Sequence, residues 1–287
     1  MIAHVAEASE ASGRVLLWLD PGAVSMPQTF DASVRIASAF AADLETVVID
    51  GPSASEIGDV PAAYVSLLGR PRDQRLGLTP VPLARDLLAE RQRREVGERA
   101  ERARVNVSHA SAGGDAIDRL AEMCLMRGPW NIVAVSRPPS QELPAILSSI
   151  LANVSGATGV VVAGRRSAAL RPDVAVVVED AERMPSMLRA ADRLVMPGGR
   201  IHVMIAAETA AAYDELEAQV RLVTAGAHNC VHHAGGPDYG IPGALDDTLF
   251  ALRPGFIIAR FGGTLLGDTR ALSRLLGLAP GPFLLVR

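Results

Sequence analysis

The feature that most constrains the fold is an alternation of short apolar runs with longer helical patterns, which occurs twice along the chain. In the first half the apolar runs begin with RVLLWLD (14–20) and end with GVVVAG (159–164). In the second half they begin with DVAVVVE (173–179) and end with PFLLVR (282–287). Strands that alternate with helices are typical of a parallel sheet covered by helices. The pattern predicts five strands and four connecting helices in each half.

A tandem organisation also suits the length of 287 residues, and hydrophobic residues make up 49% of the chain, enough for two cores. NIVAVSRPP (131–139) and FIIARFGG (256–263) share a pattern, because each is an apolar strand that ends in an arginine and turn residues. This match indicates duplication. We place the connector at RRSAALRPD (165–173) and expect domains at 1–168 and 169–287, each forming its own sheet.

The second strand (45–50) is followed by a segment too rich in proline to be one helix. Pro61, Pro71, Pro80 and Pro82 lie in it, and a helix interior excludes proline. Residues 83–104 carry many charges of both signs at helical spacing, which indicates a solvated helix with Glu–Arg pairs. The segment 53–82 has no assigned role.

Composition removes several classes of function. The net charge of -4 disfavours nucleic-acid binding. All 28 basic residues are arginine, which excludes a Walker lysine, a Schiff base and a lysine general base. Cys124 and Cys230 are far apart in the sequence and fit a reducing compartment. We find neither a secretion signal nor an apolar run of about 18 residues, so we expect a cytoplasmic protein without membrane segments.

Together these elements resemble the universal stress protein family in its tandem form. The resemblance rests on RVLLWLD with its terminal acid, the order of elements in each half, the fourth strand that runs into a turn, and the closing PFLLVR. It covers nearly the whole chain except the proline-rich segment. It implies an α/β fold of two Rossmann-like (adenine nucleotide alpha hydrolase-like) domains, each a five-stranded doubly wound parallel sheet. It also implies that the two modules pair as separate subunits do in one-domain relatives.

The resemblance implies a place to look for ATP or AMP. Nucleotide-binding members of that family hold ATP with an acid after the first strand and a loop of pattern G-x2-G-x9-G-[ST] after the fourth. Glycines in such a loop let the backbone approach the phosphates, and the helix N-terminus attracts them. The second half offers Ala259, Gly262, Leu272 and Ser273 at the pattern positions, Gly263 and Gly267 as further glycines, and Glu179 or Asp180 as the acid.

In the first half the same loop departs further from the pattern. Ser136 and Pro139 stand at the first two glycine positions, and a proline has no N–H to donate to a phosphate. Asp20 keeps the acid, and Ser148 and Ser149 keep hydroxyl groups. We expect degenerate nucleotide sites with corners too crowded for a triphosphate. The candidate residues are Asp20, Ser148, Ser149, Asp180, Gly262, Gly263 and Ser273.

The resemblance implies a non-enzymatic protein of stress adaptation that acts through homodimerisation or by binding a partner or small ligand, with no required cofactor. The alternative is a protein that binds ATP or AMP and hydrolyses it weakly, using Asp20 and the loop 262–273. Catalysis of acyl transfer has no support, because no G-x-S-x-G turn is present. Asp246 and Asp247 are adjacent on a helix and point apart, and Trp18 and Trp130 suit the core.

A third hypothesis is a metal site in HNCVHHA (228–234). His228, Cys230 and His232 alternate along this strand and so share one face, and both residue types bind zinc. Two further ligands are conceivable, His233 and Asp238. Residues two apart on one strand seldom converge on one ion, so the simpler interpretation is an edge strand with partly exposed histidines. We therefore assign no metal ligand.

Overall fold

The computed structural model describes residues 13–23, 26–50, 64–65, 74–75, 80–126, 130–137, 142–164, 167, 171–233, 244–263 and 269–287. The first half contains β1 (Arg14–Leu19), α1 (Pro27–Ala39), β2 (Asp43–Asp50), α3 (Pro80–Ala103), β5 (Val107–Gly113), α4 (Ala116–Met126), β6 (Asn131–Ser136), α5 (Leu143–Asn153) and β7 (Ala157–Val162). Within the proline-rich segment, β3 (Tyr64–Val65) pairs with β4 (Gln74–Arg75) in antiparallel orientation.

The second half repeats the alternation. It contains β8 (Val174–Val178), α6 (Met184–Leu194), β9 (Ile201–Ile205), α7 (Ala210–Thr224), β10 (Cys230–His233), α8 (Ala244–Leu252), β11 (Phe256–Arg260), α9 (Thr269–Leu278) and β12 (Phe283–Val286). Every residue of β1, β6 and β8 is buried, which explains why these strands are continuous apolar runs. The Thr209 hydroxyl caps α7 by accepting a hydrogen bond from the Ala212 N–H at 3.2 Å.

The two halves have the same sheet topology. The strand order is β5-β2-β1-β6-β7 in the first half and β10-β9-β8-β11-β12 in the second, and all neighbours within each half are parallel. When the five strands of each half are numbered along the chain, with β3 and β4 left out, both halves have the order 3-2-1-4-5. The predicted five-stranded doubly wound unit is therefore confirmed in both halves. The exact domain boundaries at 168 and 169 stay a prediction.

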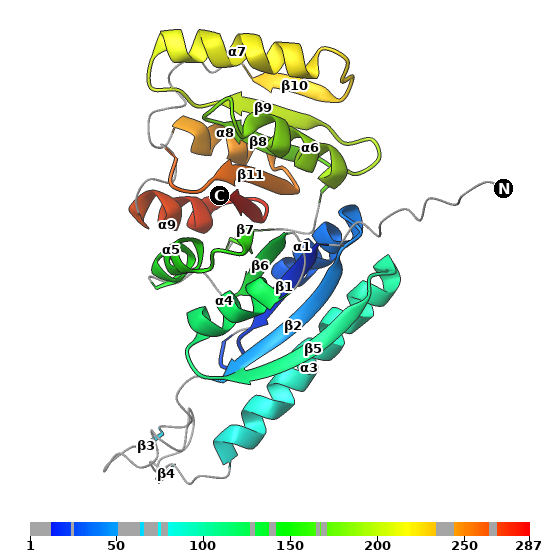
Figure 1. Cartoon of the computed structure of the whole chain (residues 1–287), viewed down its shortest axis with the longest axis vertical. Coiled ribbons are helices and arrows are strands. Elements are labelled where there is room, and N and C mark those ends of the chain that lie inside the picture. The colour runs from blue at the N-terminus through cyan, green and yellow to red at the C-terminus, as the bar shows by residue number, and fades with distance from the viewer. Residues whose placement is uncertain are drawn as a thin grey trace, which may run out of the picture.

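The expectation of two separate sheets is wrong. β12 pairs with β7 in antiparallel register from Phe283 with Val162 to Val286 with Gly159, so the two layers form one ten-stranded sheet (Figure 1). Residues of α1, α3, α6 and α7 belong to one hydrophobic core cluster, and residues of α4, α5, α8 and α9 belong to the other. Within the described residues, four helices therefore cover each face of the sheet.

One element begins at a different position from that predicted. α3 begins at Pro80, because its prolines fall in the first turn, where the backbone N–H is not needed by the helix. The chain leaves α3 through Arg104 at a φ of 56°, and β5 follows from Val107 to Gly113. β5 is an edge strand with half-exposed residues, so it has no apolar run to mark it in the sequence.

Two arginines connect the halves beside the shared sheet. Arg35 of α1 donates to the Leu194 carbonyl at the end of α6, at 3.0 Å from its Nε, and to the Arg171 carbonyl at 2.9 Å. Arg287 donates to the Leu151 and Ser155 carbonyls at the end of α5. Each arginine thus satisfies carbonyl groups at a helix C-terminus of the other half, where a positive charge is favourable. Burial lowers the pKa of Arg35 to about 10, so its guanidinium stays charged at neutral pH.

A pair of histidines lies on β9 and β10, the last two strands on the second-half side of the sheet. His202 of β9 is buried, and its Nδ1 lies 2.8 Å from Nε2 of His233 on β10. The Nε2 of His202 is 3.6 Å from a carboxylate oxygen of Asp173. One of the two facing nitrogens must donate and the other accept, so the contact requires at least one neutral ring. Burial lowers the pKa of His233, and the nearby His202 and His232 lower it further.

We predict that Arg35→Ala destabilises the protein by about 1–3 kcal/mol, because the partly buried Leu194 carbonyl loses a charged donor. Urea denaturation measures this change. Arg94→Ala is the matched control, since Arg94 is exposed on α3 of the same half. Equal stability of the two variants would show that Arg35 does not connect the halves.

We also predict that the free energy of unfolding falls as the pH drops below about 6.5, the ordinary pKa of histidine. His233 has a lower pKa in the folded chain, so the unfolded chain binds more protons in this window and is favoured. His233→Gln removes the titrating group and should flatten this dependence, whereas His228→Gln, at an exposed position, should keep it. Thermal melts between about pH 5 and 8 test both; an unchanged slope in His233→Gln would contradict the assignment.

Candidate functional site

The strand order places one ligand-binding corner in each half. In an open α/β sheet, ligands bind at the carboxyl ends of the strands where the order reverses. That point lies between β1 and β6 in the first half and between β8 and β11 in the second. Because β7 and β12 are antiparallel, the strands of the two halves run in opposite directions and the two corners lie at opposite ends of the sheet.

The first-half corner opens into a pocket of about 1040 Å³. Side chains at the ends of β1 and β2, the first residues of α4 and one face of α5 line it, and they include Trp18, Asp20, Asp50, Arg85, Asp115, Arg137, Ile146 and Ser149. This volume is at the upper end of ordinary small-molecule sites. The described part of this corner therefore has room for a nucleotide. The expected crowding concerns Pro138 and Pro139, which lie outside the described residues, so it stays a prediction.

An ion pair occupies the centre of this corner. Arg137, the residue after β6, places its Nε 2.6 Å from Oδ2 of Asp20, the residue after β1. The Arg137 guanidinium carbon also lies 5.2 Å from the ring centroid of Trp18, which fixes its position from the other side. The second Asp20 oxygen accepts the Gly22 N–H at 3.0 Å. Both oxygens of Asp20 are thus engaged by the protein itself.

Other charged residues of the pocket wall are also held in contacts within the protein. Arg85 of α3 lies 3.4 Å from Asp50 at the end of β2. Asp115 caps α4 by accepting the Ile117 N–H at 2.9 Å, after Gly114 turns the chain at a φ of +113°. The described residues that line the pocket include no histidine or cysteine. The arrangement can bind a polar small molecule.

The second-half corner repeats the ion pair with different residues. Arg260 at the end of β11 lies 3.0 Å from Oδ2 of Asp180, which follows β8, and the Arg183 N–H donates to the other oxygen at 2.8 Å. Gly262 adopts a φ of +72°, as a tight turn requires. Gly263 is packed against Glu179, because a Cβ on Gly263 would lie 1.4 Å from the Glu179 carboxylate and that side chain would have to move. The carboxylates of Glu179 and Asp180, the two acids after β8, are therefore both packed against other groups of the protein.

The predicted candidates divide between these corners. Asp20 and Ser149 line the first-half pocket, whereas Ser148 turns its hydroxyl to the Pro144 carbonyl at 2.9 Å. Asp180, Gly262 and Gly263 follow neighbouring strands β8 and β11 of the second half. Ser273 is exposed on α9. Its neighbour Leu272 is buried in the core, so its side chain does not stand over a phosphate position. Gly267 and the loop 138–141 lie outside the described residues.

The arginines that pair with Asp20 and Asp180 were visible in the sequence, but their role as ion-pair partners was not. We used the arginine after each fourth strand as a mark of duplication, and the structure shows Arg137 and Arg260 as partners of Asp20 and Asp180. The pair of Arg85 and Asp50 had no local signal, because the two residues are 35 positions apart in the sequence. Trp18 is buried as predicted, and it also lines the pocket.

The metal hypothesis gains no support from the described residues, among which no group of three His, Cys, Asp or Glu side chains could hold an ion. Nε2 of His232 lies 2.8 Å from the Thr224 hydroxyl, and His233 turns instead to His202. Cys230 is partly buried, and Asp238 lies outside the described part of the chain. In the same part of the chain, the helices are too short or too polar to cross a membrane.

Comparisons with known proteins agree with this architecture. No protein-family model matches the sequence, and no curated protein matches it either. Among solved structures, a universal stress protein from Archaeoglobus fulgidus DSM 4304 is similar with a TM-score of 0.62 at 15% identity, over 96% of this chain and 97% of that chain. A protein of unknown function from Pseudomonas aeruginosa PAO1 gives a TM-score of 0.51 at 16% identity, over 96% and 92% of the two chains.

These likenesses extend over nearly the full length of both chains, so they include the tandem arrangement and not only one module. At this level of identity they establish the fold. The chain has the fold of the universal stress proteins in tandem form, and the predicted resemblance is confirmed at that level.

Proposed function

We propose that this chain is a tandem universal stress-type protein that acts in stress adaptation by binding and not by catalysis. The fold supports this assignment, and so does the chemistry of the two corners. Each corner has an acid after its first strand, as nucleotide-binding members of the resembled family do, but each acid is paired with an arginine. The ligand of this protein therefore differs from a nucleotide held in the family manner.

The pair of Asp20 and Arg137 is the observation that carries the proposal. The Asp20 side chain is 17% exposed and Arg137 is 33% exposed, so the pair is only partly screened by water. A ligand hydroxyl that replaced Arg137 would leave a guanidinium without its carboxylate, which is costly in a partly buried site. Pro138 and Pro139, the next two residues of the sequence, have no backbone N–H to donate to a phosphate. The first-half pocket is thus suited to a polar small molecule without a triphosphate.

A specific observation favours a second candidate function. The first-half pocket lies at the strand-order reversal, is large enough for a nucleotide, and has Asp20 and Ser149 in its wall. These features support an ATP- or AMP-binding protein with weak hydrolase activity. The two candidates differ in whether Arg137 gives way to the ligand.

Thermal stability in the presence of ATP and magnesium separates them. We predict no change in the melting temperature, whereas a ligand bound at 100 times its dissociation constant would add about 2.7 kcal/mol to the free energy of unfolding. A clear rise that is lost in Asp20→Asn and kept in the matched variant Asp180→Asn would refute the proposal and establish the nucleotide function in the first half.

We further propose a cytoplasmic homodimer. Edge strands β5 and β10 leave one side of their backbone unpaired within the described residues, and such edges favour association. Native mass spectrometry of freshly purified protein should give a complex of two chains. A monomer at micromolar concentration would contradict the dimer, and the same spectrum reports any nucleotide or metal that remained bound.

A further inference from the structure

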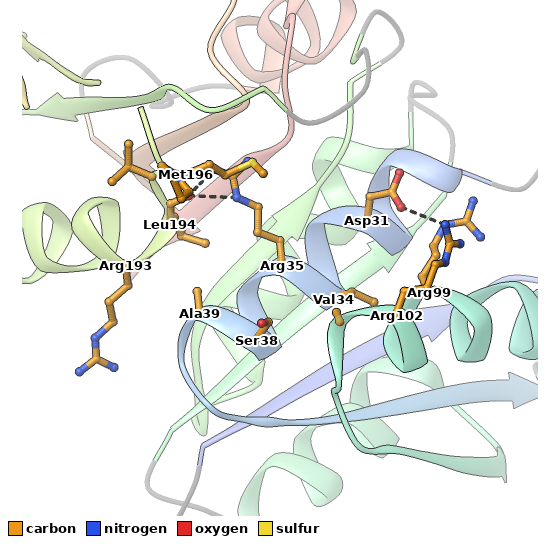
Figure 2. Close-up of a pocket in the computed structure, with 13 residues that line it drawn as sticks. Asp31, Val34, Arg35, Ser38, Ala39, Arg99, Arg102, Arg193, Leu194 and Met196 are labelled. Carbon is orange, nitrogen blue, oxygen red and sulfur yellow. Dashed lines mark hydrogen bonds and ion pairs between the residues drawn. The ribbon is translucent and has the colours of Figure 1, made fainter. Parts of the chain in front are cut away.

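A second pocket lies at the junction of the two halves, away from both corners. It has a volume of about 450 Å³. α1 and the end of α3 form one wall, and the end of α6 with the turn that follows it forms the other (Figure 2). Its lining residues include Asp31, Arg35, Ser38, Arg99, Arg102 and Arg193. We call it the junction pocket.

Positive charge is concentrated in the junction pocket. Four arginines and one aspartate line it, although the whole chain has a net charge of -4. Arg99 pairs with Asp31 at 2.9 Å. Arg35 donates to backbone carbonyls, which leaves its charge uncompensated by a carboxylate.

Arg102 and Arg193 are the available groups. Neither forms an ion pair with any residue that the structure describes. Arg102 donates from Nε to the Glu98 carbonyl at 3.0 Å, and the Arg193 guanidinium carbon lies 5.3 Å from the Phe40 ring centroid. Both contacts orient the side chain and leave guanidinium N–H groups for a ligand. In Figure 2, Arg193 lies on one side of the pocket and Arg102 on the other, with Arg35 between them.

We propose that the junction pocket binds a small molecule carrying two or more phosphate groups. Arginine forms paired, charge-assisted hydrogen bonds with phosphate oxygens. Two unpaired arginines on opposite sides favour a ligand with more than one anionic group. The Ser38 hydroxyl is a further polar group, and Val34, Ala39 and Met196 provide an apolar wall for an organic part. Such a ligand contacts both halves at once and stabilises their junction.

Calorimetric titration with inorganic pyrophosphate, without magnesium and at low salt, tests this proposal. The double variant Arg102→Ala/Arg193→Ala should weaken binding at least about tenfold. The matched control Arg94→Ala/Arg270→Ala removes the same charge at two exposed positions outside the pocket and should bind within about twofold of the original protein, since only long-range attraction changes. Melting curves without ligand verify that each variant is folded, and the single variants replace the double one if it is not.

Four outcomes would overturn the proposal. Pyrophosphate could fail to bind, or bind the pocket variant as tightly as the original protein. The control could lose as much affinity as the pocket variant, which would mean a general effect of charge. Loss of binding in Arg137→Ala with retention in Arg102→Ala/Arg193→Ala would place the anion in the first-half pocket instead. Because the proposed function concerns Asp20 and Arg137, its failure and the failure of this inference give different results.

Discussion

The antiparallel pairing of β7 with β12 is the constraint on which the rest of the structure depends. Each half alone would be an open sheet with its fifth strand exposed as an unpaired edge. Pairing these two edges makes one ten-stranded sheet and brings together the helices beside the seam, α1 with α6 on one face and α5 with α9 on the other. The fit is close, since a Cβ on Gly159 would lie 3.0 Å from the Leu285 carbonyl oxygen across the seam. Arg35 and Arg287 then connect each half to a helix end of the other.

The same pairing determines where binding can occur. It directs the strand ends of the two halves in opposite directions, so the two corners are separate and cannot share a ligand. The junction pocket arises only because α1, α3 and α6 meet beside the seam. A repeated fold thus has two related corners and one composite pocket that neither half possesses alone.

Arginine has three distinct roles in this lysine-free chain. Arg137 and Arg260 neutralise the acids that follow the first strand of each half. Arg35 and Arg287 donate to carbonyl groups at helix ends, which suits a planar group with several donors. Arg102 and Arg193 line the junction pocket without a carboxylate partner among the described residues. They are the pair that we propose for binding, because the other four have structural partners.

The sequence by itself determined the order and type of the strands and helices, the duplication and the family of folds, because hydrophobic periodicity is local and is repeated in both halves. It also identified Asp20 and Asp180 at the corners, since each follows a buried strand. It did not show the shared sheet, the start of β5, the partners of the acids or the junction pocket. These depend on contacts between distant residues, such as Arg35 and Leu194, which are 159 residues apart. Only the tertiary structure decided them, because the register of β7 with β12 determines which helix ends and which arginines meet.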